Sequence, residues 1–139
     1  MTLTEVGAVF VPVTDQDRSL EFYVGKLGFE KVADFTYGGH HRWVEVAPPG
    51  ARNTIALVPP SEGRSAGADV TRCAFACGDI EAEHRTLGER GVDVDEQIAR
   101  EGTPRTGLVS GDAIVEDPVP AQFFFRDPDG NRFLIVQPG

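Results

Sequence analysis

The residues best suited to chemistry lie in the stretch GGHHRWVEV, residues 38–46, where two histidines precede a tryptophan and a glutamate. Imidazole and carboxylate groups can ligate a divalent metal or exchange protons, and an indole ring can stack on a planar ligand. Because strand residues alternate between faces, His41, Trp43 and Glu45 should share one face. A metal held by His41 and Glu45 is conceivable, but the two lie far apart on one strand and lack a third ligand. We therefore favour a turn histidine and a polar strand edge.

The other reactive side chains form no pattern of a metal or catalytic site. His84 is expected in the middle of a helix, where a packing or surface role explains it. Cys73 and Cys77 would lie about 13 Å apart on one strand, too far for a disulfide, and we interpret both as buried thiols. No serine lies in a triad signature, and no glycine-rich stretch matches a phosphate loop. Glu45 is the one weak candidate for a catalytic base.

Composition limits the classes of partner. The chain has 139 residues, 40% of them hydrophobic, which suits one soluble domain. Thirteen Lys and Arg against 22 Asp and Glu give a formal charge of −9, and an acidic surface disfavours nucleic acid. We find neither a run of 18 apolar residues nor a basic-then-apolar leader. The expectation is a cytoplasmic protein that binds neither nucleic acid nor membrane.

The elements that must position these residues follow one order. The β-rich stretch at residues 5–13 leads into Asp15, a plausible helix N-cap, and Gly28 can end the helix. Three strand candidates follow, EKVADFTY, HRWVEVAP and NTIALVPP, separated by Gly and Pro turns. The apolar residues of the helix recur at helical spacing: Leu20, Tyr23, Val24 and Leu27.

The same order then begins again. VTRCAFACGD, residues 70–79, predicts a strand ending in an Asp cap, and IEAEHRTLGERG predicts a helix. The strand VDVDEQIA and the hairpin AQFFFRD–NRFLIVQ complete the second copy. We therefore predict a single domain, residues 1–139, of two βαβββ modules at 5–60 and 69–137. An inserted loop at about 101–119, with one short strand candidate, DAIVE, carries several apolar residues, and we interpret it as functional.

A core follows from the strand and helix periods. Its predicted members are Val9, Val11, Val13, Leu20, Tyr23, Leu27, Val44, Val46, Cys73, Phe75, Leu87, Phe123, Phe125, Phe133 and Ile135.

Two motifs carry a family resemblance: TDQDRSLEFYVGKLGFEKV in the first module and FFFRDPDGNRFLIVQ at the end of the second. With the doubled βαβββ order, they resemble the vicinal oxygen chelate superfamily over about residues 5–137. That superfamily includes glyoxalase I, extradiol dioxygenases, fosfomycin-resistance transferases and bleomycin-binding resistance proteins. The resemblance implies an α+β fold, in which paired modules form a curved mixed sheet around a cleft. It also implies a homodimer.

The metal site of that superfamily is not retained. In metal-dependent relatives, His or Glu ligands come from the first and last strand of each module. The matching positions here are Ala8, Ala56, Arg72 and Leu134, none of which can bind a cation. We therefore predict a protein without metal or cofactor.

What remains on the cleft side is a set of aromatic, small and charged residues that suits a planar, partly polar small molecule. One hypothesis is a binding protein that sequesters an aromatic or natural-product-like compound, as in antibiotic self-resistance. The alternative is a glyoxalase-like lyase or isomerase, or another enzyme of this fold, that uses Glu45 and Arg72. The predicted ligand-binding residues are Phe10, Pro12, His41, Trp43, Glu45, Thr54, Ala56, Arg72, Phe124 and Leu134.

Overall fold

Two βαβββ units make up the chain, and the predicted α+β fold is confirmed. The computed structural model describes residues 2–60, 65–67, 70–100 and 120–138. The inserted loop predicted at 101–119 and its strand candidate DAIVE lie outside the described residues. By residue contacts, unit 1 comprises Met1–Val70 and Pro128–Asn131, and unit 2 comprises Thr71–Asp127 and Arg132–Gly139.

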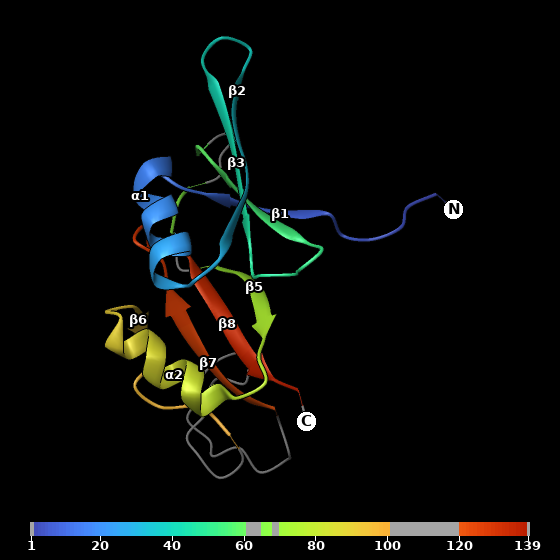
Figure 1. Cartoon of the computed structure of the whole chain (residues 1–139). Coiled ribbons are helices and arrows are strands. Elements are labelled where there is room, and N and C mark those ends of the chain that lie inside the picture. The colour runs from blue at the N-terminus through green and yellow to red at the C-terminus, as the bar shows by residue number, and fades with distance from the viewer. Residues whose placement is uncertain (1, 61–64, 68–69, 101–119, 139) are drawn as a thin grey trace. The chain divides into compact units, whose positions relative to one another are not determined.

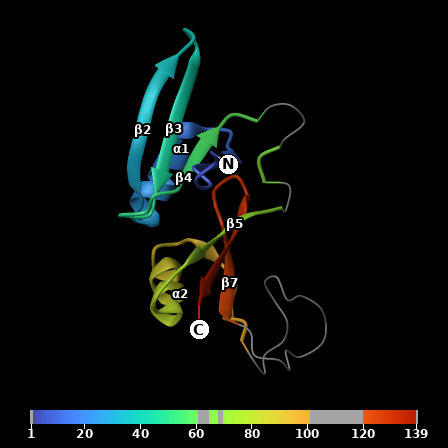
Figure 2. The ribbon, with the colours of Figure 1, turned by 90° about the vertical axis from the view of Figure 1, so that its right-hand side faces the viewer.

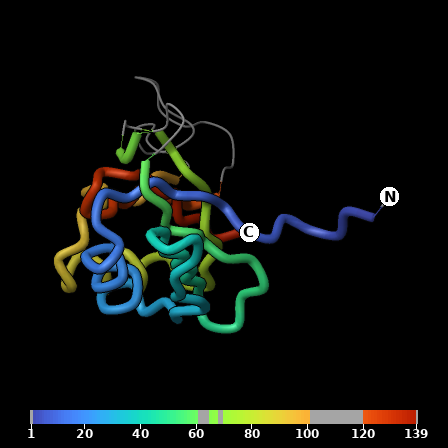
Figure 3. The backbone as a smooth tube through the Cα atoms, turned by 90° about the horizontal axis from the view of Figure 1, so that it is seen from above, coloured from blue at the N-terminus to red at the C-terminus, as the bar shows by residue number. Residues whose placement is uncertain are grey.

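Unit 1 is a four-stranded mixed sheet in the order β1-β4-β3-β2, with the helix α1 against one face (Figures 1 and 2). β1 and β4 are parallel and the other neighbours antiparallel. Residues before β1 extend away from the sheet (Figure 3). The elements are β1 Ala8–Pro12, α1 Gln16–Leu20, the π-helix η1 Glu21–Lys26, β2 Glu30–Tyr37, β3 His41–Ala47 and β4 Thr54–Val58.

Unit 2 repeats this arrangement with the strand order β5-β8-β7-β6. The strand predicted at VDVDEQIA is shorter than expected, because the Asp95 carboxylate accepts the backbone N–H of Phe124 at 3.1 Å and interrupts the strand pairing. An isolated bridge between Ala99 and Gln122 follows. The elements are β5 Thr71–Ala76, α2 Ile80–Glu89, β6 Asp93–Val94, β7 Ala121–Arg126 and β8 Arg132–Gln137.

The first helix differs from the prediction in its second half. Asp15 caps it as expected, accepting the N–H of Arg18 at 3.0 Å. From Glu21 onward the helix is of π type, and the N–H of Leu27 donates to the carbonyl of Phe22, five residues earlier. A π turn is wider than an α turn, so the buried face shifts relative to regular helical spacing.

The shift changes which helix residues are buried. Val24, which the spacing placed on the apolar face, is 38% exposed, whereas Phe22 is buried beside Tyr23; Ser19, in the α-helical part before the π segment, is buried as well. Among the described helices, none has the length and hydrophobicity needed to cross a bilayer.

The predicted core is two-thirds correct. Ten of the fifteen residues are buried: Val11, Val13, Tyr23, Val44, Val46, Leu87, Phe123, Phe125, Phe133 and Ile135. The other five are only half-buried: Val9, Leu20, Leu27, Cys73 and Phe75. Four of these five lie on β1, on β5 or at an end of the first helix, where fewer elements cover a side chain; β1 and β5 are edge strands of their sheets.

Residues 128–131, the turn between β7 and β8, pack within unit 1. Asn131 is fully buried, its Nδ2 donates to the carbonyl of Pro12 at 2.8 Å, and its Oδ1 accepts the N–H of Gly67 at 2.8 Å. Gly67 has φ +74°, and a Cβ there would lie 2.5 Å from the carbonyl oxygen of Asp129. The side chain of Asn131 therefore satisfies buried backbone groups from two other segments.

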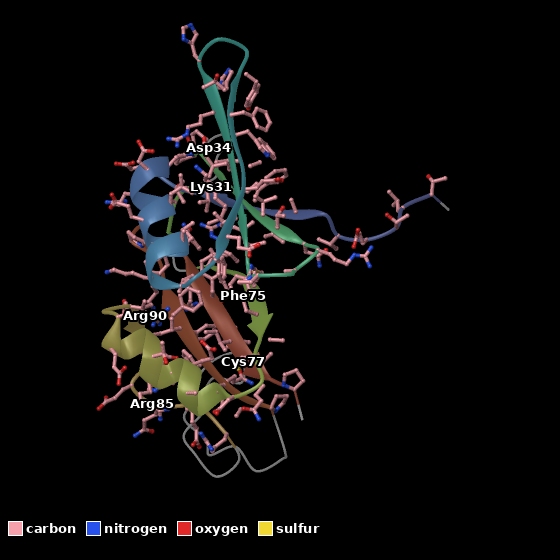
Figure 4. All side chains as sticks on the ribbon, in the orientation of Figure 1. Lys31, Asp34, Phe75, Cys77, Arg85 and Arg90 are labelled. Carbon is pink, nitrogen blue, oxygen red and sulfur yellow. The ribbon has the colours of Figure 1, made fainter. Side chains whose placement is uncertain are left out.

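A second fixed point of unit 1 is Arg42 on β3. Its guanidinium binds both carboxylate oxygens of Asp34 on β2 at 2.8 Å and reaches Asp17 on α1 at 2.7 Å. Lys31 and Asp34 lie on the side of β2 nearer α1 (Figure 4). The hydrogen bonds and charge of Arg42 lower the pKa of Asp34 to about 2. This contact joins β2, β3 and α1.

We predict that Asn131→Ala lowers the free energy of unfolding by about 2–4 kcal/mol, because two buried backbone groups lose a partner. Urea titration followed by circular dichroism measures the change. The matched control is Asn53→Ala at an exposed position, which should stay within about 0.5 kcal/mol of wild type. An equal loss in both variants would contradict the role assigned to Asn131.

We predict that the Asp34 carboxyl titrates at about pH 2 and returns toward its ordinary pKa of 3.8 in Arg42→Met. Because the folded-state pKa is the lower one, the Asp34–Arg42 contact stabilises the fold fully above about pH 4 and is lost as the pH falls toward 2. A carbon-detected NMR titration of the carboxyl groups measures this. An Asp34 titration that is the same in Arg42→Met as in wild type would contradict this prediction.

Candidate functional site

The strand β3 separates two kinds of side chain. Val44 and Val46 are fully buried, and Arg42 joins them on the side of α1. Trp43 and Glu45 alternate with them and lie on the opposite side of the sheet. The strand therefore presents its aromatic and acidic side chains away from the helix.

We call the side of the unit 1 sheet away from α1 the aromatic face. Strand pairing brings its members together: Phe35 lies opposite Trp43, Tyr37 opposite His41, and Phe10 opposite Ala56. Several members keep much of their surface, with Phe10 at 49%, Phe35 at 54% and Tyr37 at 49% exposure. Its strand residues are Ala8, Phe10, Pro12, Glu30, Ala33, Phe35, Tyr37, His41, Trp43, Glu45, Ala47, Thr54, Ala56 and Val58.

The rings of the aromatic face contact one another. Phe10 meets Trp43 edge to face, with ring centroids 5.9 Å apart at 82°. Tyr37 stacks on His41 at 5.2 Å, and Phe35 lies 6.5 Å from Tyr37. Such contacts fix the orientation of half-exposed rings before any ligand arrives.

Glu45 lies in the middle of this face. It pairs across the strands with Ala33 on one side and Ala56 on the other, and it is half-buried. The hydroxyl of Thr54 donates to Glu45 Oε1 at 3.2 Å. The result is an anionic group between small residues, beside the ring of Trp43.

Sequence reasoning missed Phe35 and Tyr37. Both belong to EKVADFTY, whose period of two also gives Ala33, Phe35 and Tyr37 a common face, so the signal was present. It could not be assigned to the ligand side, because the register between β2 and β3 contains a bulge at Lys31–Ala33.

The predicted site residues of unit 2 have less free surface. Phe124 and Leu134 are 6% and 1% exposed. The guanidinium of Arg132 lies 4.7 Å from the centre of the Phe124 ring, and its Nε donates to the hydroxyl of Thr71 at 3.0 Å. The cation that contacts an aromatic ring here is thus Arg132, which the ligand-binding prediction did not include.

Arg72 lies where the alternation of β5 is interrupted. The register pairs Thr71 with Arg132 and Ala74 with Leu134, so β5 has one more residue between the pairs than β8 has. The prediction that Arg72 and Ala74 share one face assumed regular alternation along β5. Because the strand contains a bulge between Thr71 and Ala74, that assumption does not hold.

The remaining reactive groups have structural surroundings. His84 Nε2 contacts the carbonyl of Asp95 at 2.6 Å, and its ring meets Phe123 edge to face. Burial raises the pKa of the Cys73 thiol to about 11 and raises that of Cys77 as well, which disfavours the reactive thiolate. Phe75 lies on β5, and Cys77 directly follows the end of that strand (Figure 4).

The residues do not fit the metal centre of related proteins. Ala8 and Ala56 lie on the aromatic face, where their methyl groups offer no lone pair, and Arg72 and Leu134 take the corresponding positions of unit 2. Within the described part of the chain, no three His, Cys, Asp or Glu side chains come together in a way that could hold a metal ion.

Comparison with known proteins places the chain in a family. The sequence profile of the Glyoxalase/Bleomycin resistance protein/Dioxygenase superfamily matches residues 5–135. The fold is similar to TnmS3, described as an antibiotic binding protein from Streptomyces sp. CB03234, with 33% identity, a TM-score of 0.78, and coverage of 100% of this chain and 99% of that one.

Two further similar proteins support the same family assignment. A superfamily member from Sphaerobacter thermophilus DSM 20745 is 31% identical, with a TM-score of 0.79 and coverage of 99% and 100%. The uncharacterized protein YurT of Bacillus subtilis (strain 168) is 33% identical over 141 residues, covering 95% of this chain and 96% of its own. This chain belongs to the glyoxalase/bleomycin resistance protein/dioxygenase superfamily.

Proposed function

We propose that this protein binds a planar, largely apolar small molecule on the aromatic face, without a metal ion, and holds it unchanged. The observation that carries the proposal is a cluster of rings on one side of a sheet, in which the exposed Phe10 and Phe35 lie with the half-buried Trp43. The compound class would be aromatic or natural-product-like, as for an antibiotic self-resistance protein. A similar fold in an antibiotic binding protein supports this class.

The aromatic face is suited to binding because its rings stand on strands. A stacked ring contributes roughly 0.5–1.5 kcal/mol beyond the apolar area that it covers. Affinity increases when little freedom is lost on binding, and strand positions fixed from the other side by Arg42 lose little. A planar molecule could therefore contact several rings with small reorganisation.

The other predicted ligand residues enter the proposal in different ways. His41 and Thr54 lie on the aromatic face, and Ala56 forms its floor, fully covered by its neighbours. Pro12 is buried, and its carbonyl is held by Asn131. Homodimer formation stays a prediction, as does the participation in ligand binding of Arg72, Phe124 and Leu134.

Binding can be distinguished from catalysis by recovery of the ligand. After long incubation with excess protein, an anthraquinone probe extracted and analysed by mass spectrometry should be chemically unchanged. Formation of a product that depends on Glu45 would favour the lyase or isomerase hypothesis.

We predict that 1,4-dihydroxyanthraquinone quenches the fluorescence of Trp43, the only tryptophan. Trp43→Ala should weaken binding about tenfold or more, because stacking and buried area are both lost. Calorimetry measures the variant, which lacks the fluorophore. Val24→Ala removes an exposed apolar side chain from the helix side and should bind as wild type does. Unchanged affinity of Trp43→Ala, with its fold intact, would refute the proposed site.

We also predict that the protein, produced with iron, manganese, nickel and zinc available, carries far less than one metal atom per chain. Chelator treatment should leave anthraquinone affinity unchanged, since the four matching positions offer no ligand atoms. Plasma mass spectrometry and calorimetry measure the two effects. A stoichiometric metal whose removal abolishes binding would contradict the proposal.

A further inference from the structure

We propose that Glu45 sets the ligand class of the aromatic face: a planar aromatic compound that carries a protonated amine. This inference rests on the proposed function and goes beyond it by assigning a charge to the ligand. The inference rests on the position of the Glu45 carboxylate, which lies among the rings of the face and has no cationic partner in the described residues.

The carboxylate of Glu45 is only partly satisfied. Thr54 is its one hydrogen-bond partner among the described residues, and that bond uses Oε1. None of the ion pairs in the described part of the chain involves Glu45. An ionised carboxylate accepts several hydrogen bonds and donates none, and Oε2 is not among the described side-chain atoms that are buried without a partner, so it can accept a bond from a ligand.

No cation on the strands of the aromatic face neutralises this charge. The strand residues of the face include two glutamates, Glu30 and Glu45, and neither a lysine nor an arginine. The arginine of β3, Arg42, points to the other side, where Asp34 and Asp17 bind it. The formal charge of the whole chain, −9, adds a long-range attraction for cations.

The rings around Glu45 favour the same ligand charge. The faces of Trp, Tyr and Phe rings attract cations through their quadrupole. Trp43 and Phe35 pair across β3 and β2, two residues along the strands from the pair of Glu45 and Ala33. A ligand amine placed over Ala33 would contact the carboxylate while the attached ring system covers the aromatic side chains. An anionic group in the same place would meet a like charge, which disfavours it.

An ammonium group fits better than a neutral hydroxyl. Hydrogen bonds between two charged groups are about twice as strong as neutral ones. The Thr54 hydroxyl already supplies one neutral donor to Oε1. The site therefore lacks a positive charge, and this lack matters more than the lack of a second neutral donor.

The test uses three probes with one ring system: 2-(aminomethyl)anthraquinone, 2-(hydroxymethyl)anthraquinone and anthraquinone-2-carboxylate. We expect wild type to bind the amine about tenfold more tightly than the alcohol and the carboxylate most weakly. Calorimetry at low salt measures all three. The preference for the amine should shrink as sodium chloride is raised, since the contact is partly exposed.

Glu45→Gln keeps the size of the side chain and an acceptor for Thr54. In this variant the amine should lose its tenfold advantage, while the affinity for the alcohol stays within about twofold. Glu21→Gln, which removes the same charge from the exposed helix side of unit 1, is the matched control and should keep the preference. Unfolding curves of both variants show whether the fold is retained.

The outcomes separate this inference from the proposed function. Equal binding of amine and alcohol by wild type, with quenching of Trp43 by both, would overturn the inference and leave the aromatic platform supported. Loss of the preference in Glu21→Gln as well as in Glu45→Gln would also overturn it, because the effect would then come from net charge. Binding of none of the probes would overturn the platform itself.

Discussion

Successive side chains of β3 point to opposite faces of its sheet, and much of unit 1 depends on this constraint. The pleat sends Arg42 toward α1, where Asp34 and Asp17 bind its guanidinium, and sends Trp43 and Glu45 to the other side. A slip of one residue would bury Glu45 against the helix and expose the valines of the core. The core, the interstrand ion pairs and the aromatic face thus fix one register together.

The turn of residues 128–131 holds the end of β1 in place. Its Asn131 side chain gives the carbonyl of Pro12 a donor, and the next backbone amide, that of Val13, bonds to Val58 at 2.7 Å. Phe10 lies two residues before Pro12 on this strand. Because Asn131 holds the end of β1, the motion of the Phe10 ring, which contacts Trp43 on the aromatic face, is limited.

Strands and turns were predictable from sequence because their signals are local. EKVADFTY coincides with β2, and the capping residues Asp15 and Asp79 bond as their positions indicated. The π-helix was not predictable, since apolar spacing does not show that the Leu27 N–H bonds five residues back. The bulge of β5 near Arg72 depends on pairing with β8, which lies about sixty residues later in the chain. The exposure of Phe35 depends likewise on its place in an edge strand.

Loss of the metal ligands changes what selectivity such a fold can have. A metal ion concentrates recognition at one point and demands particular ligand atoms. A sheet face of rings spreads recognition over an area, so affinity follows shape and covered surface and tolerates chemical variation. Under the proposed function, selectivity comes from the polar groups left on the face, and Glu45, flanked by Ala33 and Ala56, is the one placed at its middle. The small residues thus have two consequences: the methyl group of Ala56 cannot hold a metal, and Ala33 places no large side chain opposite the carboxylate.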